Sequence, residues 1–128
     1  MLLVDDDSAV REITAAMLHD LGFHVLEAGS GGAALDVLAR EPKIDLLLLD
    51  YAMPGMTGAE VAEEVRGHCP DLPILFITGY ADLAALKEVG EDRVVQKPFR
   101  EAELAEKIAR AFAVAKPDNV VELRARGG

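Results

Sequence analysis

One stretch of the sequence decides the fold: Asp45-Leu46-Leu47-Leu48-Leu49-Asp50. A continuous apolar run of this length is typical of a strand that is buried on both of its faces. Pro54 and Gly55 follow closely and exclude a helix at that point. Thr57-Gly58-Ala59-Glu60 then has the spacing of a capping box, in which the first and fourth residues exchange hydrogen bonds at the start of a helix. A buried strand followed by a turn and a helix is the repeating unit of folds with a parallel sheet.

Short apolar runs and amphipathic segments alternate in the same way along the rest of the chain. The sequence predicts strands over residues 2–4, 23–28, 45–49, 73–77 and 93–95. It predicts helices around residues 10–21, 34–38, 57–65, 83–89 and 100–115, and a turn over residues 29–32. Strict alternation of strands and helices predicts a doubly wound α/β fold, in which helices cover both faces of a parallel sheet. Residues 1–116 are expected to form this domain, and the polar segment 117–128 a flexible tail or linker stub.

The composition narrows the classes of function. A chain of 128 residues fits one domain, and its 13 basic and 23 acidic residues give a net charge of −10. This charge argues against a nucleic-acid partner, because phosphate neutralisation needs clustered Lys and Arg, and against docking on an anionic membrane. The apolar runs are too short to span a bilayer, and the single cysteine, Cys69, excludes an internal disulfide and a cysteine-based metal site. We therefore expect an acidic cytoplasmic domain without nucleic-acid or membrane contacts.

Side chains with useful chemistry follow four of the predicted strands. They are Asp5, Asp6 and Asp7 after the first strand, Asp50 after the third, Thr78 after the fourth and Lys97 after the fifth. In an open parallel sheet the ligand binds beyond the carboxyl ends of the strands, so we expect these side chains to meet at one edge. Taken singly, each has an ordinary structural explanation. Asp7 in particular is as well explained by the preference of acids for helix N-termini.

Taken together, these residues predict a site for phosphoryl transfer. Converging carboxylates raise one another's pKa and need a cation near neutral pH, and ligands that offer only oxygen favour Mg²⁺. Thr78 and Lys97 supply a hydroxyl and an ammonium, which are donors for anionic oxygens. Catalysis in such sites consists mainly of positioning and charge neutralisation. Asp50 is the predicted nucleophile, forming an aspartyl phosphate, because it lies on the middle strand between the acids and the Thr78 and Lys97 pair.

With these residues in place, the chain resembles the receiver domain of two-component response regulators over roughly residues 2–115. The segments that carry the resemblance are Leu2-Leu3-Val4-Asp5-Asp6-Asp7, Leu47-Leu48-Leu49-Asp50, Met53-Pro54-Gly55-Met56-Thr57-Gly58, Ile77-Thr78-Gly79 and Gln96-Lys97-Pro98-Phe99. The resemblance implies the flavodoxin-like fold of the CheY-like superfamily, a (βα)5 sandwich whose five parallel strands have the order 2-1-3-4-5.

The resemblance also implies a role for each acid of the site. Asp50 would be the phosphoacceptor and, with Asp6, a direct ligand of Mg²⁺. Asp5 would bind the ion largely through water, and the backbone carbonyl of Ala52 would be a further ligand. The domain would then not be an enzyme acting on an external substrate. It would catalyse its own phosphorylation and a slow autodephosphorylation.

The resemblance also implies roles for the two hydrogen-bond donors and for a partner protein. Thr78 would bond the phosphoryl group, Lys97 would pair with one of its oxygens, and the Lys97–Pro98 peptide bond would be cis. The phosphoryl donor would be a histidine kinase or a histidine phosphotransfer domain of a bacterial signalling system. We expect it to dock at the rim of the site, on Ser8-Ala9-Val10 and Pro98-Phe99.

The chain departs from the family pattern at some positions. Val94 stands where many members carry Tyr or Phe, so an aromatic switch is not expected. The segment between Thr78 and Lys97 is short. This argues for a monomer and against dimerisation through the face formed by the fourth helix, the fifth strand and the fifth helix, which many DNA-binding regulators use. Tyr80 is expected to shield the acyl phosphate partly from water. The stretch from Ile77 to Asp82 looks like receivers attached to hybrid histidine kinases, so the chain is either a stand-alone receiver or a fragment of such a kinase.

Two other functions remain as alternatives. A haloacid-dehalogenase-type phosphatase would use the Asp-x-Asp spacing of Asp5-Asp6-Asp7, but the chain has no acidic pair after Lys97 for a second metal motif. A phosphorylation-independent interaction module is the other alternative. Degenerate receivers usually lack the acceptor or the lysine, and this chain has both Asp50 and Lys97.

Overall fold

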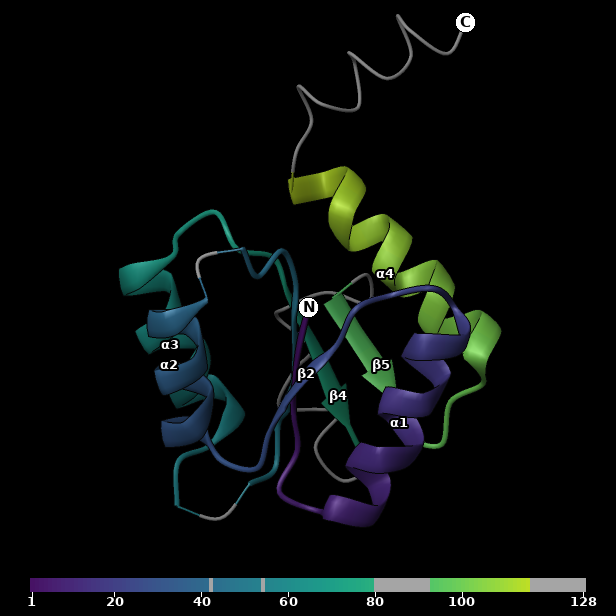
Figure 1. Ribbon diagram of the computed structural model, residues 1–128, viewed down its shortest axis with the longest axis horizontal. Helices are drawn as coiled ribbons and strands as arrows, with labels where there is room; N and C mark the ends of the chain where they lie inside the picture. The colour runs from purple at the N-terminus through teal and green to yellow at the C-terminus, as the bar shows by residue number, and fades with distance from the viewer. Residues whose placement is uncertain (42, 54, 80–92, 116–128) are drawn as a thin grey trace, which may run out of the picture.

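In the computed structural model, which describes residues 1–41, 43–53, 55–79 and 93–115, five parallel strands form a sheet between two layers of helices (Figure 1). The strands are β1 (Leu2–Val4), β2 (Leu26–Ala28), β3 (Leu47–Asp50), β4 (Ile74–Thr78) and β5 (Val94–Gln96). Their order is β2-β1-β3-β4-β5, and each neighbouring pair is parallel. The predicted flavodoxin-like fold is therefore confirmed.

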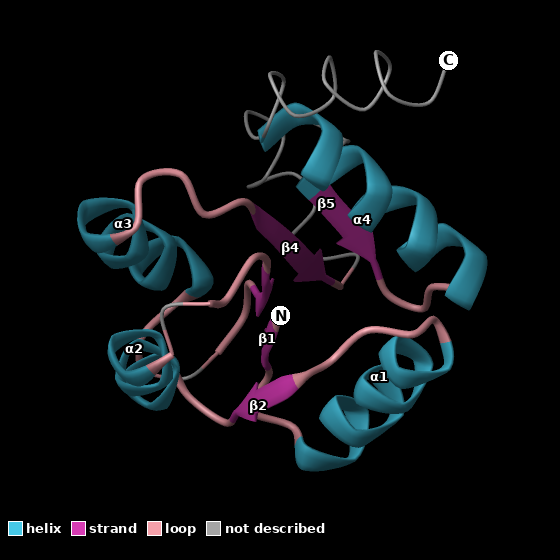
Figure 2. Ribbon diagram, turned by 45° about the horizontal axis from the view of Figure 1, so that its top comes forward, coloured by secondary structure: helices cyan, strands magenta, loops and turns pink. Residues whose placement is uncertain are grey.

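The helices of the described residues lie in pairs on the two faces of the sheet. They are α1 (Ser8–Asp20), α2 (Gly31–Arg40), α3 (Gly58–His68) and α4 (Glu101–Ala115). Helices α2 and α3 cover one face, and α1 and α4 cover the other (Figures 1 and 2). Within the described residues, no helix is both long enough and apolar enough to cross a membrane. The helix predicted around residues 83–89, Tyr80 and the segment 117–128 lie outside the described residues.

The central strands are buried on both faces, as the leucine run predicts. Alternate side chains of a strand point to opposite sides of a sheet. Leu47 and Leu49 accordingly pack with α2 and α3, while Leu46 and Leu48 pack with α1 and α4. All four leucine side chains are fully buried. The core thus consists of two apolar layers that share β3, the strand that ends in Asp50.

Local hydrogen bonds define the ends of the helices. The Thr57 side chain accepts a hydrogen bond from the backbone N–H of Glu60, and the Glu60 side chain accepts one from the backbone N–H of Thr57. This confirms the predicted capping box. Ser30 caps α2 by accepting from the N–H of Ala33. Gly22 follows α1 with a φ of 93°, a conformation that favours glycine and ends the helix.

Several predicted boundaries are wrong. Only Leu26–Ala28 of the predicted strand 23–28 pairs with β1, because β1 begins at Leu2 and Phe23 is bonded back to Leu18 of α1. The predicted turn over 29–32 is also too long: Gly31 and Gly32 are already helical, because Ser30 is the cap. At the carboxyl ends of β3, β4 and β5 the strands run further than predicted, so Asp50 and Thr78 are the last residues of their strands.

Candidate functional site

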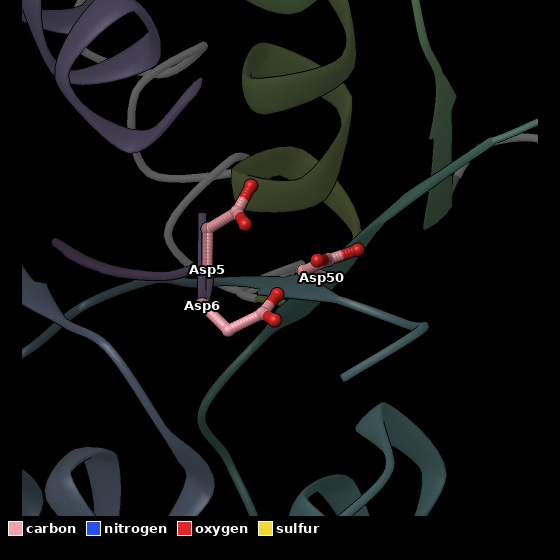
Figure 3. Close-up of side chains that lie close together, drawn as sticks. All are labelled: Asp5, Asp6 and Asp50. Atoms are coloured by element: carbon pink, nitrogen blue, oxygen red, sulfur yellow. The ribbon is translucent and has the colours of Figure 1, made fainter. Parts of the chain in front are cut away.

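Three acidic side chains meet at the carboxyl edge of the sheet. Asp5 and Asp6 follow β1, and Asp50 ends the neighbouring strand β3. Each offers a carboxylate oxygen, and these atoms lie within 4.8 Å of one another. Figure 3 shows the three side chains gathered at this edge, with Asp6 pointing toward Asp50. Asp5 and Asp50 are buried and Asp6 is exposed, so the cluster opens to solvent on one side.

Asp7 does not belong to this cluster. Its carboxylate accepts hydrogen bonds from the backbone N–H groups of Ala9 and Val10 and so caps α1. Its own N–H donates to Oδ1 of Asp5 over 2.9 Å. The explanation of Asp7 as an ordinary helix cap is therefore confirmed, and the bond to Asp5 helps to fix that side chain in the site.

Among the described residues, Lys97 brings the one ammonium group that contacts the acids of this cluster. Its Nζ lies 3.4 Å from Oδ2 of Asp5 and 3.7 Å from Oδ1 of Asp50. The backbone holds this lysine in place, because its N–H donates to the carbonyl oxygen of Thr78 over 2.7 Å. The Lys97–Pro98 peptide bond is cis, as the family resemblance implies.

Thr78 lies fully buried at the end of β4, next to the strand that carries Asp50. Its hydroxyl donates to the carbonyl oxygen of Gly79 over 3.1 Å. A hydrogen bond between neutral groups is weaker than one to a charged oxygen. An anionic oxygen would be a stronger acceptor for this hydroxyl than the Gly79 carbonyl.

Burial raises the pKa of Asp50 to about 6, and the nearby negative charge of Asp5 adds to this rise. A side-chain hydrogen bond with Asp5 acts in the same direction. Lys97 and a backbone hydrogen bond with Ala52 oppose the shift in pKa. The protein alone therefore leaves the ionised cluster short of positive charge. The donor set, which consists of oxygens only, fits a hard divalent cation such as Mg²⁺.

Gly58 packs against the backbone of Asp50 and Tyr51. A Cβ at this position would lie 2.7 Å from Cα of Tyr51 and 2.8 Å from the carbonyl oxygen of Asp50. The N–H of Gly58 donates to the carbonyl oxygen of Tyr51 over 2.9 Å. The first residue of α3 thus packs directly on the backbone that presents the acid, and only glycine leaves enough room.

We expect Gly58→Ala to destabilise the protein by about 1–3 kcal/mol, because the added methyl group overlaps backbone atoms that cannot move separately. Gly67→Ala in the same helix is the matched control. A Cβ there meets nothing within 4 Å, and alanine should raise stability by up to about 1 kcal/mol through its helix propensity. Urea unfolding of both variants measures the difference. Equal stability of the two would show that the close contact at Gly58 is not important.

Arg11 also lies at this edge, although it was not among the predicted site residues. Its Nη1 donates to the backbone carbonyl oxygen of Asp5 over 2.7 Å, and its Nε pairs with Oε1 of Glu27 at 3.2 Å. One signal was available in the sequence. A cation in the first turn of a helix interacts unfavourably with the helix dipole, so an arginine at this position indicates a compensating contact.

Comparison with known proteins identifies the class to which this fold and site belong. Residues 1–109 match the family model described as the response regulator receiver domain. The chain is 36% identical over 118 residues to the response regulator receiver protein CpdR of Brucella abortus, covering 90% of this chain and 98% of CpdR. It is 38% identical over 125 residues to the response regulator MprA of Mycobacterium leprae, covering 95% of this chain and 54% of MprA. The chain thus spans about half the length of MprA.

Solved structures agree with this classification. A structure of NtrX from Brucella abortus matches with a TM-score of 0.83 and 27% identity, covering 99% of this chain and 30% of NtrX. A CheY-like receiver domain protein from Methanospirillum hungatei matches with a TM-score of 0.78 and 28% identity, covering 91% and 95% of the two chains. This chain belongs to the family of response regulator receiver domains, the signalling domains of two-component systems. These matches favour a receiver over a haloacid-dehalogenase-type phosphatase.

Proposed function

We propose that this receiver accepts a phosphoryl group from a partner phosphohistidine onto Asp50, with Mg²⁺ as its cofactor, and that it supplies the catalytic groups itself. One observation carries the proposal: a buried carboxylate at the end of the middle strand lies within reach of two further acids and one ammonium. A nucleophile, ligands for a cation and a donor for anionic oxygens are the parts that phosphoryl transfer requires.

The residues that would hold Mg²⁺ are Asp6, Asp50 and the backbone carbonyl of Ala52, with Asp5 contributing through water. The convergence of three carboxylates supports this assignment. The exposure of Asp6 supports it as well, because Mg²⁺ keeps several of its waters. When bound, the ion neutralises negative charge on the phosphoryl oxygens and on the carboxylates.

In the proposed reaction an ionised oxygen of Asp50 attacks the phosphorus atom of the phosphohistidine. A P–O bond forms, the N–P bond breaks, and its electron pair stays on the imidazole nitrogen of the partner. The nucleophile must be ionised, and with a pKa of about 6 Asp50 is mostly ionised above neutral pH. Lys97 would pair with a phosphoryl oxygen, and the Thr78 hydroxyl would donate to another. Hydrolysis of the acyl phosphate by water would reset the domain slowly.

A groove next to the site supports docking of the partner at the predicted rim. It has a volume of about 480 Å³ and is lined by Val10, Ile13, Thr14, Met17, Lys97, Pro98 and Phe99. Ile13 is 60% exposed and adds apolar surface to this groove. Because Lys97 lines the groove and also contacts Asp50, a helix of a histidine kinase or phosphotransfer domain seated there would bring its phosphohistidine close to the acceptor.

We further propose a division of the chain, a cellular setting and a mode of signalling. Residues 1–116 would act as the receiver and 117–128 as a tail or linker. The domain would work as a cytoplasmic monomer without nucleic-acid or membrane contacts. Phosphorylation would signal through a change in conformation that begins at the carboxyl edge of the sheet.

Incubation with a small acyl phosphate and Mg²⁺ tests the proposal. Intact-protein mass spectrometry should detect one added phosphoryl group, and EDTA or Asp50→Asn should abolish the addition. Asp7→Asn is the matched control, because asparagine also caps helices well and Asp7 lies outside the cluster. Labelling that survives Asp50→Asn would refute the assignment. Repeated turnover of a phosphate monoester would indicate a phosphatase, and failure to bind Mg²⁺ would indicate a phosphorylation-independent module.

A further inference from the structure

Arg11 links the ends of two strands at the carboxyl edge of the sheet. Its guanidinium donates to the backbone carbonyl of Asp5, directly after β1, and pairs with Glu27 on β2. The two distances are 2.7 Å and 3.2 Å. The bond to the Asp5 carbonyl is partly buried, whereas the pair with Glu27 is exposed to water. A partly buried hydrogen bond from a charged donor is stronger than one between neutral groups.

The acceptor of this bond explains its importance. The Asp5 carbonyl belongs to the peptide unit that joins Asp5 to Asp6, two of the three clustered acids. A peptide unit is planar, so holding its oxygen in one direction fixes the orientation of the whole unit. The bond from Arg11 therefore restricts the orientation of this peptide unit, and with it the direction in which the exposed Asp6 side chain extends toward the cluster.

The surroundings of Arg11 are built to accept the guanidinium. A Cβ at Gly29 would lie 3.2 Å from Nη1 of Arg11, a tighter contact than real Cβ atoms usually make. Glu27 supplies the opposite charge that a cation in the first turn of a helix lacks. It also offsets the positive charge of Arg11, which would otherwise repel a cation bound by the nearby acids. The arrangement keeps the directional hydrogen bond of the arginine and reduces its electrostatic effect.

We propose that Arg11 is a positioning residue for cation binding, which acts by holding the Asp5–Asp6 peptide through the Asp5 carbonyl. This inference rests on the proposed Mg²⁺-dependent phosphorylation of Asp50. Loss of the bond leaves the acids present but lets Asp6 turn away from Asp50. Mg²⁺ then binds more weakly, whereas phosphoryl transfer at saturating Mg²⁺ proceeds nearly as before.

Titration calorimetry with Mg²⁺ on the full chain tests the inference, using Arg11→Ala, Arg11→Lys and Glu27→Ala. Loss of an outer partner of a metal ligand typically lowers metal affinity by 10- to 100-fold, so we expect roughly tenfold weaker binding for Arg11→Ala. Glu27→Ala is the matched control, because it removes the ion pair and leaves the donor to Asp5. It should weaken binding much less. Arg11→Lys keeps a charged donor and should restore part of the affinity.

Phosphorylation rates across a series of Mg²⁺ concentrations add a second measurement. For Arg11→Ala the Mg²⁺ concentration for half-maximal rate should rise about tenfold while the maximal rate changes little. A merely structural role would instead lower stability in EDTA without moving that concentration. Equal effects of Arg11→Ala and Glu27→Ala on Mg²⁺ affinity, or wild-type affinity in Arg11→Ala, would overturn the inference. If the wild-type chain neither binds Mg²⁺ nor accepts phosphate, the proposed function itself fails, which is a distinguishable result.

Discussion

Asp50→Asn should stabilise the metal-free protein at pH 8 by about 3 kcal/mol, because one unit of pKa shift corresponds to about 1.4 kcal/mol. Folding raises the pKa of Asp50 from 3.8 to about 6, mainly through burial. Between these two values the folded state binds a proton that the unfolded state has lost. Stability therefore falls as the pH rises through this window, and it stays low above it. Asparagine has nearly the same shape and no such charge.

Urea unfolding in EDTA at pH 4.5 and pH 8 measures this effect. The advantage of Asp50→Asn should be large at pH 8 and small at pH 4.5, where the wild-type side chain is mostly protonated. Asp71→Asn is a suitable control, because Asp71 is exposed and lies at the amino end of β4. Added Mg²⁺ should stabilise the wild type more than Asp50→Asn by mass action. Equal stability of the variant and the wild type at pH 8 would contradict the burial of an ionised acceptor.

Lys97→Met should lower the stability of the metal-free protein at pH 8 by about 3 kcal/mol. The substitution removes the ammonium that lies beside both buried acids and leaves their charges uncompensated. This value is at the low end of the range for buried pairs, because the Lys97 side chain is 30% exposed. Loss of the Lys97 ammonium also raises the pKa of Asp50 further, because this ammonium lowers the pKa in the wild type. The loss of stability should therefore be smaller at pH 5, where Asp50 is protonated.

The same variant separates two roles of the lysine. Mg²⁺ should bind Lys97→Met more tightly than the wild type, because the bound cation no longer lies near a fixed positive charge. Phosphorylation should nevertheless be slower, because the donor for a phosphoryl oxygen is lost. Lys43→Met, at an exposed position before β3, is the control for loss of a lysine charge. Weaker Mg²⁺ binding in Lys97→Met would show that the lysine supports the cation site instead of competing with it.

Much of the fold could be predicted because its determinants are local. The leucine run ending at Leu49 predicts a strand buried on both faces, and both apolar layers indeed contain it. Parallel strands place their carboxyl ends at one edge, so Asp5, Asp6 and Asp50 could be expected together before any distance was known. The capping box at Thr57 likewise depends on residues three positions apart.

Strand pairing and side-chain contacts between segments that are distant in sequence are harder to predict. Phe23 belongs to an apolar segment that looks like a strand, but its N–H donates to the Leu18 carbonyl and ladder pairing with β1 begins only at Leu26. The bond from Arg11 to the Asp5 carbonyl and its pair with Glu27, sixteen residues away, follow no periodic pattern. Such contacts become visible only when the strand order and register are known.

The contact between Asp5 and Lys97 joins residues that are 92 positions apart. Closing so long a loop costs chain entropy, which the contacts of the intervening strands must offset. A chain that lacks its fifth strand has the three clustered acids but not the ammonium that lies beside two of them. On the proposed mechanism, rapid phosphoryl transfer would thus require that the fifth strand has joined the sheet, and partly folded chains would accept a phosphoryl group more slowly.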